Sequence, residues 1–205
     1  MSRARTRPPW CAWSRRWRNW TTSSPSTLTT TFLTRFSRPS RPHSLKVLGV
    51  DPGLVGTGYG LIEPGPGGVA VLGSGVISTS ADLPLEARIH LIYDGVRRLL
   101  ETQTPTVLVL EDLYAEYKFP RTALLMAHAR GVICLAARQC DVAVLALAPA
   151  EVKRAVAAAG AASKHQVQHS VRRILKLDAL PTPSHVADAL ALALTGFSRL
   201  GGRLG

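Results

Sequence analysis

Short apolar runs between residues 45 and 147 predict five β-strands. The runs are Leu45–Asp51, Thr57–Glu63, Val69–Ile77, Thr106–Leu110 and Val142–Leu147. Glycine-rich turns separate the first three runs, so we expect these strands to form an antiparallel meander. Longer segments separate the later runs, and these segments have room for helices.

Apolar residues in the remaining segments recur every three or four positions, which predicts five helices. The helices span roughly 84–102, 121–139, 149–158, 164–176 and 184–198. The order βββαβαβααα predicts an α/β fold, with a mixed five-stranded sheet of a three-strand antiparallel meander plus two parallel strands, flanked by helices. A right-handed crossover places the fourth strand beside the first. Ligand sites in open α/β sheets lie at the carboxyl ends of strands at such a reversal.

Two carboxylates fall at the strand ends that this topology brings together. Asp51 ends the first predicted strand and Glu111 follows the fourth. If these strands are parallel neighbours about 4.8 Å apart, the side chains converge and repulsion raises the pKa of one carboxyl group. A divalent cation removes that conflict, and carboxylate oxygens suit Mg²⁺ or Mn²⁺ better than zinc. One acid alone is more simply a solvated strand end, but two at equivalent ends favour a metal site.

A histidine and an aspartate share one face of the last predicted helix. His185 and Asp188 are three residues apart, so their side chains project on the same side. The neighbouring residues are almost wholly apolar, which predicts burial against the sheet, and an acid in such a helix needs a partner. A charge that complements the helix dipole is the weaker explanation for Asp188. His185 taken alone is more often an exposed histidine without a role.

A glycine-rich stretch follows the first aspartate and is compatible with two functions. Gly49–Gly53 precedes the tetrapeptide Thr57–Gly60. An aspartate before such a hairpin cradles phosphates in actin-like ATPases and sugar kinases, and it also suits a metal-binding aspartate beside a DNA strand. An actin-like ATPase needs a second, repeated domain and an adenosine-binding segment. The core of about 160 residues has room for neither.

Several sequence blocks resemble the RuvC-type Holliday junction resolvases. The blocks are LGVDPGLVGTGYGLI (48–62), LGSGVIST (72–79), LIYDG (91–95), ARGV (129–132), KHQVQH (164–169) and HVADAL (185–190). Each block alone is weak, but together they occur in the family's order across about residues 45–198. The resemblance implies a ribonuclease H-like fold, a homodimer and a crossover junction endodeoxyribonuclease that uses divalent metal.

The resemblance also assigns catalytic residues that bind metal. Asp51 matches the family's first-strand aspartate, Glu111 its fourth-strand glutamate and Asp188 its final aspartate. His185 occupies a position that is Asp in many members and His in some. This departure removes one negative charge, and it leaves open whether His185 ligates a metal or moves a proton.

The DNA-binding residues implied by the resemblance are one aromatic and several basic residues. Tyr114 falls three residues after the glutamate, where the family has an aromatic that stacks on a DNA base. Lys153 and Lys164 match basic positions near the scissile phosphate. A solvated helix face is the usual alternative for basic residues of this kind. The full set of predicted basic contacts is Lys118, Arg121, Lys153, Arg154 and Lys164.

The implied chemistry is hydrolysis of a phosphodiester. Two Mg²⁺ ions per subunit, about 3.5–4 Å apart, would clamp the phosphate, and Mn²⁺ would substitute. Asp51 would be the shared ligand, with Glu111 serving one ion. His185 and Asp188 would serve the other.

A two-fold dimer supplies two such sites, which suits paired nicks in strands of like polarity at four-way junction DNA. Small residues on the helix at 121–139 make it the expected dimer interface. The resemblance also implies partnership with a RuvA–RuvB branch-migration complex. Two other functions stay open: a ribonuclease H-like nuclease for another nucleic acid, such as an RNA–DNA hybrid, and a non-catalytic junction-binding protein.

The net charge of +12 is concentrated at the N-terminal end. Residues 1–44 hold nine arginines, all four tryptophans and no acid, which leaves 16 basic and 13 acidic residues in 45–205. This segment is a basic arm for DNA, a transit-like sequence or the product of a start site assigned too far upstream, and we favour the last. The expected organisation is a disordered or misassigned extension (1–44), a nuclease domain (45–198) and a flexible tail (199–205).

Cysteine usage and hydropathy bear on the cellular compartment. Cys11, Cys134 and Cys140 lack a zinc-like spacing, and the last two fall in an apolar helical stretch that favours buried thiols over a disulfide. No apolar run approaches the ~18 residues of a membrane span. These features favour a reducing compartment and no membrane partner, and the resemblance implies a bacterial-type cytoplasmic protein.

Overall fold

A computed structural model describes residues 44–112, 120–157 and 162–204. Its strands are β1 (Val47–Asp51), β2 (Gly56–Gly65), β3 (Gly68–Ser78), β4 (Val107–Glu111) and β5 (Ala143–Leu147). Its helices are α1 (Leu85–Gln103), α2 (Pro120–Gln139), α3 (Pro149–Ala157), α4 (Lys164–Ile174) and α5 (Ser184–Arg199). The predicted element order is confirmed, and each predicted boundary lies within two residues of the observed one.

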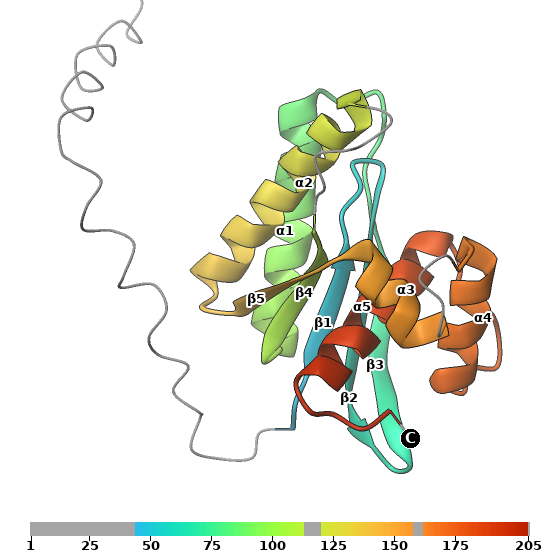
Figure 1. Cartoon of the computed structure of the whole chain (residues 1–205). Helices are drawn as coiled ribbons and strands as arrows, with labels where there is room; N and C mark the ends of the chain where they lie inside the picture. The colour runs from blue at the N-terminus through green and yellow to red at the C-terminus, as the bar shows by residue number, and fades with distance from the viewer. Residues whose placement is uncertain (1–43, 113–119, 158–161, 205) are drawn as a thin grey trace, which may run out of the picture. The chain divides into compact units, whose positions relative to one another are not determined.

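The five strands form one mixed sheet in the order β3-β2-β1-β4-β5 (Figure 1). β1 pairs antiparallel with β2, and β2 pairs antiparallel with β3. β1 also pairs in parallel with β4, which pairs in parallel with β5. The predicted meander and parallel pair are therefore confirmed, and the first strand lies at the centre of the sheet.

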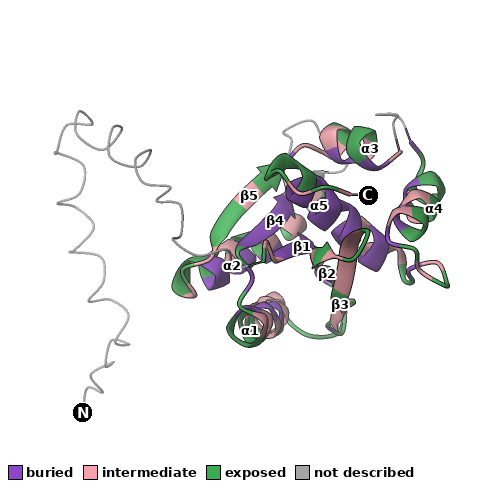
Figure 2. Cartoon of the chain, turned by 90° about the horizontal axis from the view of Figure 1, so that it is seen from below, coloured by how far each residue is buried: buried purple, intermediate pink, exposed green. Residues whose placement is uncertain are grey.

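Helices cover both faces of the sheet, and Figure 2 shows the buried strands between them. On one face, α1 and α2 pack over Leu48 and Leu108, while on the other α3, α4 and α5 pack over Val47 and Val109. Successive residues of a strand point to opposite faces, so β1 and β4 supply side chains to both cores. Burial on both faces explains why these two strands are continuous apolar runs in the sequence.

Helix α5 lies unusually close to the central strands because two glycines face it. A Cβ atom at Gly49 would lie 2.1 Å from the carbonyl oxygen of Ala189, and one at Gly58 would lie 2.1 Å from that of His185. Any side chain at either position would overlap the helix backbone. The first turn of α5 is thereby held at the carboxyl end of β1, and the predicted burial of this helix is confirmed along Val186–Phe197, apart from Asp188.

Two sequence expectations concern features beyond the core. Within the described ranges, none of the helices combines the length and apolarity needed to cross a membrane. Cys134 and Cys140 are free, half-buried thiols. The predicted N-terminal extension, including Cys11, lies outside the described residues up to position 43.

Candidate metal-dependent active site

The candidate site lies where the paired strands β1 and β4 part. Their parallel register ends at the pair Val50–Leu110. Asp51 and Glu111 are not paired with each other, although each keeps its outer neighbour: Asp51 pairs with Gly58 of β2 and Glu111 pairs with Leu147 of β5. The strands thus open at their carboxyl ends, at the point where connections run in opposite directions along the sheet.

The loop after β1 is tied down by two buried threonines. The Thr57 hydroxyl donates a hydrogen bond of 2.8 Å to the carbonyl oxygen of Gly53. The Thr79 hydroxyl donates to the carbonyl oxygen of Leu54, and its backbone N–H donates to that of Val55 at 2.9 Å. These bonds fix the turn that follows Asp51 and keep its backbone beside the opening.

Asp51 and His185 form the shortest polar contact across the site. The Asp51 carboxylate is buried, and its Oδ2 lies 2.7 Å from Nδ1 of His185. This hydrogen bond raises the pKa of His185, while burial of the ring acts in the opposite direction. The contact depends on Gly58, where a side chain would strike the main chain of His185.

Asp188 lies beside this pair on the next turn of α5. One ligand atom from each of Asp51, His185 and Asp188 falls within 4.8 Å of the others. Lys164 approaches Asp188 at 3.7 Å, but its side chain is 76% exposed. The pKa of Asp188 is nevertheless raised, chiefly by burial and then by the charge of Asp51, so this loose ion pair does not compensate the carboxylate.

Glu111 faces the same opening from β4. Burial, followed by the charges of Asp51 and Asp188, raises its pKa from 4.5 to about 7, although Lys153 and Lys164 act against the shift. Within the described ranges, no side chain donates a hydrogen bond or forms an ion pair with the Glu111 carboxylate. The sequence-based expectation that crowding raises the pKa of one carboxyl group agrees with this arrangement.

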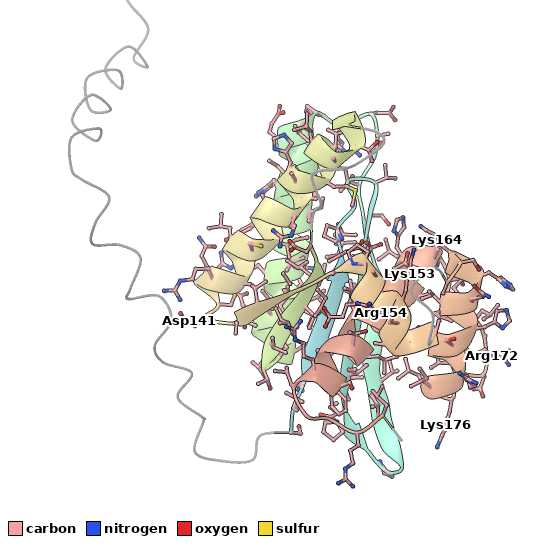
Figure 3. All side chains as sticks on the ribbon, viewed as in Figure 1. Asp141, Lys153, Arg154, Lys164, Arg172 and Lys176 are labelled. Carbon is pink, nitrogen blue, oxygen red and sulfur yellow. The ribbon has the colours of Figure 1, made fainter. Side chains whose placement is uncertain are left out.

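A single pocket of about 570 Å³ joins these groups. Asp51, Glu111, His185, Asp188, Lys153 and Lys164 all line it. Figure 3 shows Lys153, in the middle of α3, near Lys164, the first residue of α4. Arg154, the next residue on α3, is exposed and does not line this pocket.

The other predicted DNA contacts are not placed by the structure. Tyr114 and Lys118 lie outside the described residues. Arg121 belongs to the first turn of α2, but its side chain is also outside the described part.

Two arginines near the site were missed by sequence reasoning. Arg130 of α2 donates to the carbonyl oxygen of Glu111 at 3.2 Å and approaches the Asp112 carboxylate at 3.4 Å, so it anchors the end of β4. Arg88 of α1 lines the pocket and donates to the Thr79 hydroxyl at 3.3 Å. Both lie in helices where a basic residue ordinarily indicates a solvated face; Arg130 falls in the family-like block 129–132, whereas Arg88 falls in none.

The donor set fits a divalent cation. Three carboxylates and one imidazole line this pocket, and Asp51, His185 and Asp188 among them lie within 4.8 Å of one another. Oxygen-rich sets of this kind suit Mg²⁺ and Mn²⁺. Burial raises the pKa of Glu111 and of Asp188 most, and the neighbouring negative charge of Asp51 adds to both shifts. A divalent cation would relieve that repulsion, so the residues present match the metal dependence that the sequence predicts.

Comparison with known proteins identifies the family. A family model described as crossover junction endodeoxyribonuclease RuvC matches residues 47–196. The chain belongs to this family. A RuvC protein from Fusobacterium nucleatum is 36% identical over 160 residues, which cover 78% of this chain and 84% of the relative. One from Thermomicrobium roseum is 42% identical over 153 residues, which cover 75% and 93%.

Solved structures of the RuvC family agree with this fold. The structure of Thermus thermophilus RuvC in complex with a Holliday junction substrate is 34% identical, with a TM-score of 0.70. The match covers 78% of this chain and 98% of that chain. The predicted family and the ribonuclease H-like architecture are therefore confirmed.

Proposed function

We propose that the protein resolves four-way (Holliday) DNA junctions in recombination and repair by paired, metal-dependent nicks in strands of like polarity. The observation that carries this proposal is the convergence of three carboxylates and His185 at the parting of β1 and β4, in a chain of the RuvC family. The Thermus thermophilus relative has been described with a Holliday junction substrate. Among the described features, none favours an RNA–DNA hybrid nuclease or an ATPase.

Asp51, Glu111, His185 and Asp188 would hold the cations, and we assign two Mg²⁺ per subunit, with Mn²⁺ able to substitute. When bound, the cations supply Lewis-acid stabilisation of charge on the phosphate and on the attacking and leaving oxygens. The negative charge of Asp51 acts on both other acids of the site, because it raises the pKa of Glu111 and that of Asp188. This effect on both acids supports Asp51 as the shared ligand.

The remaining side chains orient groups and balance charge. The Asp51 carboxylate engages Nδ1 of His185 and thereby fixes the ring, which leaves Nε2 for a cation or a proton. Lys153 and Lys164 bring positive charge to the pocket and would offset charge that develops on the phosphate. Tyr114, Lys118, Arg121 and Arg154 remain predicted DNA contacts.

Helix α2 offers the surface for a homodimer, which places two sites on one junction. Leu124 and Leu135 are 66% and 51% exposed, and the small residues Ala127 and Gly131 lie between them. These positions follow an i, i+3, i+7, i+11 spacing and therefore form one stripe along the helix. We infer that the stripe pairs with its copy, and that the dimer acts in a bacterial-type cytoplasm with a RuvA–RuvB complex.

The decisive experiment compares three end-labelled substrates of matched sequence: a four-way junction, a linear duplex and an RNA–DNA hybrid. We expect symmetric nicks in two strands of like polarity in the junction alone, with Mg²⁺ and not with a chelator. Cleavage of the hybrid in preference to the junction, or cleavage in the chelator, would contradict the proposal.

A further inference from the structure

A long stretch around α3 and α4 is free of acidic residues. Between Glu151 and Asp178 the chain has six Lys or Arg residues, two histidines and no Asp or Glu. Only two of the six cations, Lys153 and Lys164, line the catalytic pocket. The positions of the other four cations, Arg154, Arg172, Arg173 and Lys176, are therefore not explained by the catalytic pocket.

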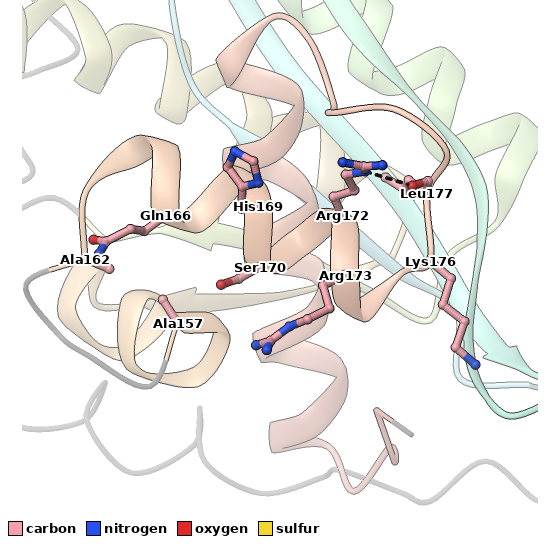
Figure 4. A pocket seen from close by; sticks show the side chains of 9 residues that line it. All are labelled: Ala157, Ala162, Gln166, His169, Ser170, Arg172, Arg173, Lys176 and Leu177. Atoms are coloured by element: carbon pink, nitrogen blue, oxygen red, sulfur yellow. Dashed lines mark hydrogen bonds between the residues drawn. The ribbon is translucent and has the colours of Figure 1, made fainter.

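A second pocket runs along α4, and three of the remaining cations line it toward the C-terminal end of the helix (Figure 4). Its polar lining residues are Gln166, His169, Ser170, Arg172, Arg173 and Lys176. Ala157 of α3 supplies part of an apolar wall. Figure 3 places Arg172 and Lys176 at the opposite end of α4 from Lys164. The cations Arg172 and Lys176 thus lie at the end of α4 away from Lys164, although the pocket extends back to Gln166 in the first turn.

Arg173 and Lys176 lack the acidic partner that several exposed arginines of the described residues have, although Arg98 and Arg154 lack one too. Arg97, Arg138 and Arg199 each meet a carboxylate at 2.7–3.1 Å. By contrast, Arg173 and Lys176 are exposed and have no carboxylate partner among the described residues. Their charge is therefore available to an anion from outside the chain.

A third cation in the pocket is held in place by the backbone. Arg172 donates through Nε to the carbonyl oxygen of Leu177 at 3.2 Å and through a terminal nitrogen to that of Asp178 at 3.1 Å. These bonds fix the guanidinium at the end of α4. A cation fixed in this way loses less side-chain entropy when an anion binds.

Neutral donors complete an anion-binding lining. The backbone N–H of Ser163 donates to Oε1 of Gln166 at 2.8 Å, which orients the amide and leaves its Nε2 as a donor. Ser170 adds a hydroxyl. Arg and Lys together with Ser and Gln donors are the groups that contact phosphate oxygens in protein–DNA complexes.

We propose that the pocket around Arg173 and Lys176 binds the phosphodiester backbone of a duplex arm of the junction, outside the catalytic pocket. This inference rests on the proposed junction-cleaving function. Arg173 follows Lys164 by nine residues, or about 14 Å along the helix axis. That distance corresponds to roughly four base pairs of duplex at ~3.4 Å each. Helix α4 therefore leads from the catalytic pocket to phosphates farther along the same arm.

The test compares a variant that lacks two positive charges at the second pocket with a variant that lacks two on α1. The R173Q/K176Q protein is compared with R97Q/R98Q, in which the same charge is lost from α1 on the other face of the sheet. Both pairs are made in the non-cleaving Asp51→Asn background, and circular dichroism and thermal melting establish that each protein is folded. Fluorescence anisotropy then gives the Kd for a labelled four-way junction over a range of NaCl concentrations.

We expect R173Q/K176Q to raise Kd on the order of tenfold at physiological salt. We also expect the slope of log K against log[NaCl] to fall by about 1.8, because each lost phosphate contact removes about 0.9. The R97Q/R98Q control should change neither quantity to this extent. Equal Kd values and equal slopes for the two double variants would overturn the proposal.

A modified substrate locates the contact. Neutral methylphosphonate linkages placed three to six nucleotides from the cleavage point should weaken binding by the parent protein but add little to the defect of R173Q/K176Q. Fully additive losses would show that the pocket contacts something else. If the unmodified protein does not cleave junctions in Mg²⁺, the proposed function itself fails. If it cleaves and only the α4 predictions fail, the docking surface alone is overturned.

Discussion

The four candidate ligands divide into two pairs with opposite electrostatics. Asp51 and His185 compensate each other through a 2.7 Å hydrogen bond, which raises the pKa of the histidine. Glu111 and Asp188 gain no comparable partner, and the pKa of each is raised by burial and by neighbouring charge. The first pair is joined by a direct hydrogen bond, whereas Glu111 and Asp188 are buried beside like charge.

This difference indicates what a cation contributes on each side. Near Glu111 and Asp188, binding of a divalent ion relieves repulsion that is already present in the folded chain. Near Asp51 and His185, a cation competes with an existing hydrogen bond. Substitutions at the two pairs should therefore have different consequences for activity, stability and pH dependence.

The largest effect is expected from Asp51→Asn, because Asp51 belongs to the first pair and its charge also acts on both members of the second. Cleavage of a four-way junction should fall on the order of 10³-fold or more, since the proposed shared ligand loses its charge. Binding should persist, because phosphate contacts lie elsewhere. A nicking assay in Mg²⁺ and a mobility-shift assay measure the two properties, and retained nicking would refute the assignment.

Gly58→Ala should disturb both pairs at once through the position of α5. The added Cβ would lie 2.1 Å from the carbonyl oxygen of His185, so the helix must move. We expect a loss of about 2 kcal/mol in the free energy of unfolding and on the order of 100-fold in activity. Gly73→Ala is the matched control, because its Cβ would meet nothing within 4 Å. Similar denaturation midpoints and nicking rates for the two variants would contradict this account.

Glu111→Gln should alter how stability depends on pH in the metal-free protein. The pKa of Glu111 is about 7 in the folded chain and 4.5 ordinarily, so between these values the folded state retains a proton that the unfolded chain has lost. The free energy of unfolding therefore falls as pH rises through this window, by about 2 kcal/mol after solvent screening.

Urea denaturation in a chelator from pH 4.5 to 7.5 measures this fall. Glu111→Gln should make it smaller and should leave the variant more stable than the parent at pH 7.5. Glu86→Gln, at an exposed position on α1, should reproduce the parent curve. An unchanged pH dependence in Glu111→Gln would mean that this carboxyl group is not the source of the effect.

His185→Asp should have the smallest effect on activity, if the side chain acts as a ligand. An aspartate restores the carboxylate that many family members carry, so junction cleavage should stay within about tenfold of the parent. Proton transfer by a positioned side chain contributes roughly 10²–10⁴-fold. A loss in that range, measured in single-turnover nicking assays, would instead assign the proton-transfer role to His185.

The sequence was sufficient to predict the sheet, and it singled out the three acidic residues that line the candidate site. Continuous apolar runs predicted β1 and β4, and right-handed connectivity made these strands neighbours. Asp51 and Glu111 follow from that topology, because they end adjacent parallel strands. Asp188 follows from the cost of an acid within an otherwise apolar helix.

Other features of the site depend on tertiary contacts that no local pattern encodes. The parting of β1 from β4 after Leu110 is a loss of pairing between two strands that each keep an outer neighbour, and hydrophobic periodicity does not report it. Arg130 anchors Glu111 through its backbone carbonyl oxygen. Arg88 lines the pocket from α1, which is distant in the sequence from the other lining residues of α3, α4 and α5. The sequence also placed Lys153 and Arg154 in one group, whereas only Lys153 faces the catalytic pocket.

At the glycines beneath α5, the backbone of the helix packs directly against the backbone of the central strands. At Gly49 and Gly58 no side chain separates the helix from the strands, so there is no deformable layer to absorb a change in volume. Core residues elsewhere can be exchanged for others of similar volume while the spacing of Asp51 and His185 is retained. For protein engineering, most core positions are therefore open to redesign. The contact of Gly49 and Gly58 with α5 is not, because the relative position of Asp51 and His185 depends on it.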